Sequence, residues 1–126
     1  MREILFKAKS IATGEWVYGN YAFTDTNGEQ HFIFHNKAFE HEVDKDTICQ
    51  FTGLLDKNGN KIWENDIVKI PMFKHCNMAI GFIEGAFCLV NAESKYVADI
   101  HYIHHAGINN TEVIGNVFDN KELLEE

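Results

Sequence analysis

The stretch that most restricts the fold of this chain is residues 50–70, which read QFTGLLDKNGNKIWENDIVKI. Residues 56–59, Asp-Lys-Asn-Gly, fit a type I turn in which Gly59 takes the left-handed conformation, and such a turn closes a hairpin with a bulge. Residues 51–55 are then an extended strand and residues 62–63 the return strand. The turn chemistry therefore predicts a β-hairpin at the centre of the chain.

A further strand is expected at residues 67–70, after a second turn at 64–66. Its apolar run is typical of a strand buried on both faces, and Pro71 ends it. With the hairpin expected at 79–90, residues 66–90 resemble an SH3-like small barrel in pattern. The side chains of the central stretch that we expect to pack inwards are Phe51, Leu55, Trp63 and Ile67.

Most of the remaining chain shows the patterns of short strands, with alternating apolar residues or β-branched and aromatic residues between turn signals. These segments are 3–9, 16–23, 31–34, 79–83, 86–90 and 111–118, with 96–102 as either strand or short helix, and 36–46 is interpreted as a polar loop with a short strand near 39–43. Gly19 indicates a bulge or a close backbone approach. Asp119 or Asn120 suits the N-cap of a helix at 121–126. The expected fold class is mainly β, a small bent β-barrel or sandwich of about eight to ten short strands with a short C-terminal helix.

The chain has 126 residues, the length of one domain, 1–126. Its 11 Lys and Arg against 19 Asp and Glu give a formal net charge of −8. Only Arg2 could make the bidentate phosphate and guanine contacts that arginine provides. The charge therefore disfavours a nucleic-acid partner and favours solubility or a basic protein partner.

The cysteines and the apolar runs indicate an intracellular protein. Cys49, Cys76 and Cys88 are odd in number and lack C-x-x-C spacing, which favours reduced thiols over a disulfide framework. No apolar run reaches the roughly 18 residues of a membrane-spanning helix, and the N-terminus lacks a signal-peptide pattern. We therefore expect a cytoplasmic protein without membrane contact.

The stretch 50–68 closely resembles the signature of YopX-like proteins, which bacteriophages and prophages encode, mainly in Gram-positive bacteria. Further similar segments are REILFKA (2–8), WVYG (16–19), EVIGNVFDN (112–120) and the Leu pair at 123–124. The resemblance covers nearly the whole chain, except for the family's variable region at 72–110. The chain departs from the family at Cys49 and Asn65, where Gly is common, and at Trp63, where Tyr is common.

This resemblance implies a mostly β fold, a tendency to form homo-oligomers and a location in the cytoplasm of the bacterial host. It implies no enzyme activity and no cofactor, because the family has no established activity, and it carries over no functional residue. The recurring motif positions are interpreted as folding positions, with glycines for turns and apolar residues for strands. They are Gln50, Phe51, Thr52, Gly53, Asp56, Asn58, Gly59, Trp63, Asp66, Ile67, Val68 and Gly115.

His101, His104 and His105 are the most suggestive chemical cluster. On a helix, His101 and His105 would share a face at the spacing that zinc ligands use. Ligands could in principle be added by His31, His35 and His41. The competing interpretation is a set of surface histidines in the variable region, and we adopt it, so that no metal is expected.

Other patterns have plainer explanations. Residues 56–60 begin like a calcium loop, but Lys61 and Ile67 stand where that loop needs Gly and Glu. An alternating acidic run forms either a surface for a basic partner or a solvated edge that blocks strand addition. Its members are Glu40, Glu42, Asp44 and Asp46.

The number of aromatic side chains leaves two interpretations open, core filling and a protein interface. The residues concerned are Phe23, Phe32, Phe34, Phe39, Phe73, Phe82 and Phe87. We expect a phage or prophage accessory protein without catalytic activity, a self-associating β scaffold that binds a host or phage protein. The alternatives are a small-barrel nucleic-acid-binding protein and, second, a histidine-dependent metal enzyme.

Overall fold

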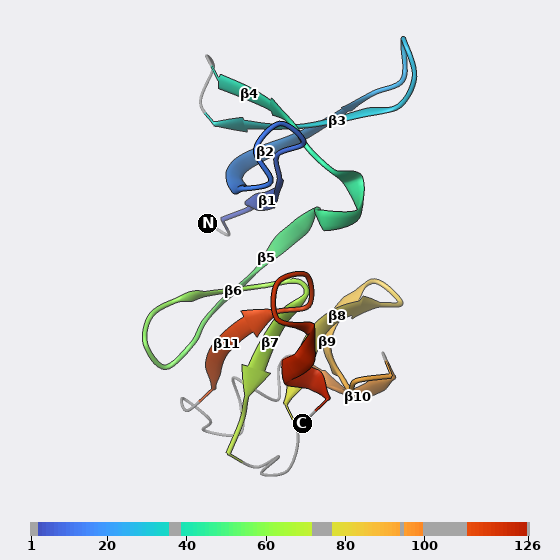
Figure 1. The fold of residues 1–126 in the computed structure, drawn as a ribbon. Helices are drawn as coiled ribbons and strands as arrows, with labels where there is room; N and C mark the ends of the chain where they lie inside the picture. Colours follow the sequence, from blue (N-terminus) through green and yellow to red (C-terminus); the bar gives the residue numbers. More distant parts are fainter. Residues whose placement is uncertain (1–2, 36–38, 72–76, 94, 100–110, 126) are drawn as a thin grey trace. The chain divides into compact units, whose positions relative to one another are not determined.

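The computed structural model describes residues 3–35, 39–71, 77–93, 95–99 and 111–125 (Figure 1). The chain divides into two compact units, Met1–Phe51 and Thr52–Glu126, and each unit is described by itself. The sequence predicts one domain over residues 1–126, and the division into two compact units does not test that prediction.

The first unit is built on antiparallel strands in the order β4-β3-β2-β1-β5. Its elements are β1 (Phe6–Lys9), β2 (Trp16–Thr24), β3 (Gln30–His35), β4 (Phe39–Glu42), the 3-10 helix η1 (Lys45–Thr47) and β5 (Cys49–Leu55). Strands β2 and β3 form a long hairpin in which Tyr21 pairs with Ile33 and Phe23 with His31 (Figure 1). The last residues of β5 belong to the second unit.

The core of the first unit lies on one face of these strands, where Ala8, Ile33 and Val43 are almost completely buried. The residues packed around them are Phe6, Val17, Tyr21 and Ile48. Gly19 lies where the backbone of β3 comes very close, because a Cβ at this position would be 1.9 Å from the carbonyl oxygen of Phe34. The close backbone approach predicted at Gly19 is therefore confirmed.

The second unit contains a five-stranded antiparallel sheet in the order β10-β9-β8-β7-β11. Its elements are β6 (Lys61–Trp63), β7 (Asp66–Lys69), β8 (Met78–Ile83), β9 (Ala86–Val90), β10 (Tyr96–Asp99), β11 (Glu112–Asn116) and the 3-10 helix η2 (Lys121–Leu124). Strand β6 neighbours β5 and forms the return strand of the hairpin predicted at the centre of the chain.

Strands β8 and β9 are covered on both faces. Ile80 and Leu89 belong to a cluster on one face, and Ala79, Cys88 and Val90 belong to a cluster on the other. Successive residues of a strand point to opposite faces, so a doubly covered strand reads as a continuous apolar run. The first cluster contains Ile62, Val68, Ile70, Met78, Ile80 and Leu89.

The mainly β fold class is confirmed, because the described residues form eleven strands and two short 3-10 helices. Over this part of the chain the strands form two open antiparallel sheets and no closed barrel. The C-terminal helix is η2, but the side chain of Asn120 does not cap it: its Oδ1 accepts the backbone N–H of Asn116 at 3.2 Å. None of the described helices is long and apolar enough to cross a membrane.

Candidate functional site

Asp56 fixes the turn of the central hairpin through its carboxylate. Oδ1 accepts the backbone N–H groups of Asn58 and Asn60, both at 2.9 Å. Oδ2 accepts the backbone N–H of Val113 in β11 at 3.0 Å. Burial raises the pKa of Asp56, but the N–H groups of Val113, Asn60 and Asn58 outweigh it and lower the pKa below the ordinary 3.8. Both carboxylate oxygens therefore hold the backbone, as the hairpin interpretation of 56–60 requires.

Thr52 and Asp66 also make structural hydrogen bonds. The Thr52 hydroxyl donates to the carbonyl of Ile62 at 2.7 Å. The Asp66 carboxylate accepts the backbone N–H of Trp63 at 2.8 Å. These bonds stabilise the β5–β6 hairpin and the turn between β6 and β7, which gives both residues a structural role.

The other motif residues occupy turns, strands and the core. Gly53 and Gly59 have φ values of +89° and +83°, and Gln50 pairs with Phe6 across β1 and β5. A Cβ at Gly115 would be 2.5 Å from Oδ1 of Asn120, which packs against it. The buried motif residues are Phe51, Trp63, Ile67 and Val68.

Leu55 differs from the prediction that it packs inwards, because it is 57% exposed. It is the last residue of β5, next to the hairpin turn, where the pattern of burial along the strand alternates towards solvent. Leu55 is thus an exposed apolar side chain of a stretch whose other motif residues build structure.

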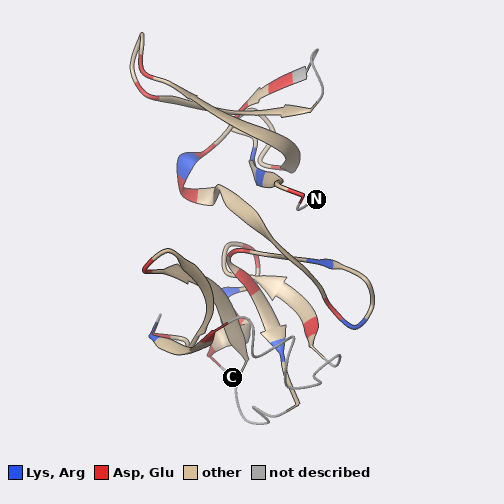
Figure 2. Ribbon diagram, turned by 180° about the vertical axis from the view of Figure 1, so that it is seen from behind, with Lys and Arg blue, Asp and Glu red and all other residues tan. Residues whose placement is uncertain are grey.

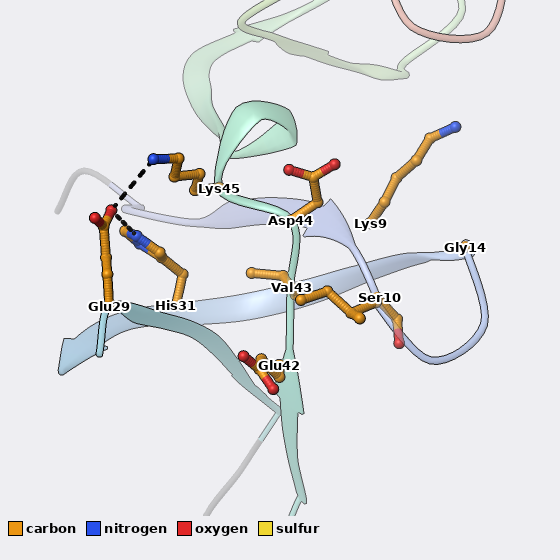
Figure 3. Close-up of a pocket in the computed structure, with 10 residues that line it drawn as sticks. Lys9, Ser10, Gly14, Glu29, His31, Glu42, Val43, Asp44 and Lys45 are labelled. Atoms are coloured by element: carbon orange, nitrogen blue, oxygen red, sulfur yellow. Dashed lines mark hydrogen bonds and ion pairs between the residues drawn. The ribbon is translucent and has the colours of Figure 1, made fainter. Parts of the chain in front are cut away.

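An open pocket of about 500 Å³ lies in the first unit. It is formed where the end of β1, the start of β3 and the segment between β4 and η1 come together (Figure 3). Its lining residues are Lys9, Ser10, Ile11, Gly14, Glu29, His31, Glu42, Val43, Asp44 and Lys45. A concave surface of this volume with converging polar groups is the usual form of a ligand site.

A chain of polar side chains runs along one wall of this pocket. The Tyr21 hydroxyl and Nδ1 of His31 are 2.6 Å apart, and Nε2 of His31 lies 2.8 Å from Oε1 of Glu29. Nζ of Lys45 lies 3.7 Å from the same Glu29 oxygen (Figure 3). The hydrogen bond to His31 and then the positive charge of Lys45 lower the pKa of Glu29. Glu29 is therefore a carboxylate held in position at neutral pH.

His31 is fixed by two aromatic rings of β2 as well as by these hydrogen bonds. The Tyr21 ring stacks on the imidazole with 5.8 Å between centroids and an interplanar angle of 10°. Phe23 pairs with His31 across the β2–β3 hairpin, and its ring centroid lies 4.9 Å from that of the imidazole. Since both ring nitrogens already have partners, His31 positions Glu29 and does not itself offer a nitrogen to a ligand.

The two remaining carboxylates of the pocket carry no compensating cation among the described residues. The Asp44 carboxylate accepts the backbone N–H of Asp46 at 3.0 Å. Glu42 forms none of the ion pairs found in this part of the chain. Lys9 extends away from Glu29 in Figure 3, and its ammonium lies 5.4 Å from the ring centroid of Trp16.

The histidine cluster at His101, His104 and His105 falls outside the described residues, so the structure says nothing about it. The rings of His35 and His41 lie 6.1 Å apart on β3 and β4. In the described parts of the chain, no group of three or more His, Cys, Asp or Glu side chains could hold a metal ion.

Two of the three cysteines are described, Cys49 and Cys88; both are buried and outside disulfides, and the Cys49 thiol donates to the carbonyl of Thr47 at 3.2 Å. Burial raises the pKa of Cys88, which disfavours a reactive thiolate there. Cys76 lies outside the described residues.

The acidic run begins on β4, the outer strand of the first sheet in the described chain, where Glu40 is exposed. Acidic and basic residues of the described chain are spread over its strands and turns (Figure 2).

The aromatic residues divide between core and surface. Phe23 and Phe82 are each 51% exposed, and Phe32, Phe34 and Phe87 are partly buried. The Phe39 side chain and Phe73 are outside the described part of the structure. Core filling alone therefore does not account for the described aromatic residues.

Sequence reasoning did not find the polar chain on the pocket wall. The available signal was the spacing of Glu29 and His31, which puts both side chains on one face of a strand. Tyr21 could have been added from the register of the β2–β3 hairpin. The pocket itself depends on long-range packing of β1 against the end of β4, which no local pattern encodes.

The chain resembles known proteins over nearly its whole length. The family model described as YopX protein matches residues 5–125. Among solved structures, the crystal structure of protein EF1440 from Enterococcus faecalis is similar, with a TM-score of 0.62 and 24% sequence identity. That similarity covers 98% of this chain and 99% of the other and shows a shared fold. No curated protein matches the chain.

Proposed function

This chain belongs to the YopX protein family, and from that membership we propose that it is a non-catalytic accessory protein that self-associates and binds a protein partner. Its gene is that of a phage or prophage, and it acts in the cytoplasm of the bacterial host. The partner is a host or phage protein with a basic surface, complementary to the net charge of −8.

The observation that carries this proposal is the exposed apolar tip of the β8–β9 hairpin. Phe82 pairs with Phe87, and their rings make an edge contact at 5.1 Å between centroids. Phe82 is 51% and the adjacent Ile83 36% exposed. The pair continues the same face as Ile80 and Leu89, so the apolar core surface extends to solvent at this tip. A second copy of the chain would bury this surface, as apolar and aromatic residues do in homodimers.

The hydrogen bonds of the motif residues favour a scaffold over an enzyme. Asp56 and Asp66, the two acidic motif residues, both accept backbone N–H groups. A carboxylate used in this way organises the chain and is not available for proton transfer to a substrate.

Light scattering coupled to size-exclusion chromatography tests self-association. We expect an oligomer at micromolar concentration, which Phe82→Ser shifts towards monomer with an unchanged circular dichroism spectrum. Leu55→Ser is the matched control, because Leu55 is a 57% exposed apolar residue of the same unit away from the β8–β9 tip. A wild-type chain that is strictly monomeric at 100 µM would contradict self-association.

Affinity capture from lysogenic or infected cells, with mass spectrometry, tests the protein partner. We expect one basic host or phage protein to be enriched by the wild-type chain. Salt-dependent binding to single-stranded DNA or RNA, in place of such a protein, would instead support the nucleic-acid alternative.

A further inference from the structure

We propose that the pocket of the first unit binds a basic side chain, arginine or lysine, presented by the protein partner. The inference rests on the proposed function, because it supplies the chemistry by which that partner is recognised. It adds a defined ligand site to the chain, distinct from the apolar hairpin tip that serves self-association.

The charges of the pocket favour a cation. Glu29, Glu42 and Asp44 line it together with two lysines. One lysine, Lys45, is paired with Glu29 at 3.7 Å, and the other, Lys9, lies over the Trp16 ring. The two carboxylates without a cation, Glu42 and Asp44, are therefore the groups that an incoming guanidinium or ammonium would neutralise.

The apolar part of the lining suits the stem of such a side chain. Two apolar side chains line the pocket, Val43, which is 2% exposed, and Ile11, which is 62% exposed. Gly14 adds no side chain to the opposite lining. Arginine and lysine bury their methylene groups against apolar surface while the charged end meets polar groups. A pocket of about 500 Å³ is large enough for one extended side chain of this kind.

The wall of the pocket is organised before any ligand arrives. Glu29 is held by His31 at 2.8 Å, and His31 is held by the Tyr21 hydroxyl and by two aromatic rings. These hydrogen bonds hold Glu29, whose carboxylate lies 3.7 Å from the ammonium of Lys45, so Glu29 and Lys45 compensate each other's charge. A pre-organised site loses less conformational entropy when it binds.

Titration of the ¹⁵N-labelled full chain with N-acetylarginine amide tests the site. We expect backbone amide shifts at Ser10, Ile11 and residues 43–45, with a dissociation constant on the order of 1–10 mM that weakens with salt. N-acetyllysine amide should act at the same residues. The citrulline analogue, which has the shape of arginine without its charge, should not. Equal shifts with the citrulline compound, or shifts that avoid the pocket, would overturn the proposal.

A double variant, Glu42→Gln with Asp44→Asn, should weaken binding by about two- to fivefold for each carboxylate. Glu93→Gln, an exposed acidic site in the second unit, should leave binding unchanged. If the double variant does not fold, the arginine and citrulline comparison on the wild-type chain still decides. Binding of putrescine without binding of the arginine amide would assign the pocket to free polyamines and overturn the partner assignment.

The outcome is separable from the tests of the proposed function. The double variant should retain the oligomeric state, because its changes lie outside the hairpin tip, and should lose the captured basic protein. An oligomer that captures its partner equally well with and without both carboxylates would refute the pocket alone. Arginine binding by a strictly monomeric chain would refute self-association alone.

Discussion

Replacing Asp56 with alanine removes the carboxylate that accepts hydrogen bonds from three backbone N–H groups. The donors are Asn58, Asn60 and Val113, at 2.9, 2.9 and 3.0 Å. A hydrogen bond to a charged group contributes about 1.5–3 kcal/mol. Asn58 and Asn60 are exposed and can turn to water, whereas Val113 is partly buried. We therefore expect Asp56→Ala to lower the free energy of unfolding by about 3 kcal/mol, and Asp56→Asn by about half of that.

Urea unfolding followed by tryptophan fluorescence measures this loss. The chain has 2 tryptophans, and a Trp16→Phe background leaves Trp63, which is 6% exposed in the same unit as Asp56, as the reporter. Asp25→Ala is the control, since Asp25 is exposed in the β2–β3 turn. If Asp56→Ala lowers the free energy of unfolding by less than about 1 kcal/mol, the reasoning is refuted, because water would then replace the carboxylate as acceptor for all three N–H groups without loss of stability.

The pH dependence gives a second test of the same carboxylate. Its pKa is lower in the folded chain than the ordinary 3.8. A depressed pKa contributes stability that is present above the unfolded-state pKa and is lost as the pH falls towards the folded-state pKa. The difference between the wild type and Asp56→Asn should therefore be full at pH 7 and shrink below about pH 4. A difference that does not change with pH would contradict ionisation of Asp56.

Three further predictions concern backbone space, packing and metal. Gly19→Ala should lower the free energy of unfolding in urea by about 3 kcal/mol or more, because its Cβ would meet the backbone of Phe34. Gly14→Ala, at a position with open space and a φ of +74°, should lower it by about 1–2 kcal/mol. Equal losses for the two variants would contradict the close approach at Gly19. Ile80→Ala, which removes a fully buried side chain, should cost about 2–5 kcal/mol, and a loss below about 1 would show that the cluster is loosely packed. Protein purified without a histidine tag should contain zinc near zero per chain, and a stoichiometric amount would restore the metal interpretation of His101, His104 and His105.

The fold could be predicted where one local rule determines structure. The turn at 56–59 needed only Gly59 in the left-handed conformation, and the structure has φ at +83° there. The doubly buried strand at 67–70 followed from its apolar run, and Ile67 and Val68 are fully buried. At Leu55 the same logic failed, because apolar character does not tell which residues of a strand end lie under a neighbour.

The candidate pocket could not be predicted, since its walls come from segments far apart in the sequence. The side chain of Glu29 meets Lys45 only because η1 is placed beside the start of β3. Asparagine is a common helix cap, which is why the sequence predicts Asn120 as a cap of η2. Its side-chain oxygen instead accepts the backbone N–H of Asn116, and the side chain packs against Gly115. Several nearby donors can compete for the oxygen of a short polar side chain, and the tertiary structure determines which of them lies within hydrogen-bond distance.

The pairing of β11 with β7 sets an order in which the second unit can be completed during synthesis. Asn116 pairs with Asp66 and Glu112 with Lys69, so two segments more than forty residues apart lie side by side. In the first unit, β2, β3 and β4 follow one another as hairpins, and β5 pairs back with β1 as soon as it is made. Translation proceeds from the N-terminus, and contacts distant in sequence form late. Strand β7 therefore leaves the ribosome without one of its two neighbours and remains so until β11 is made.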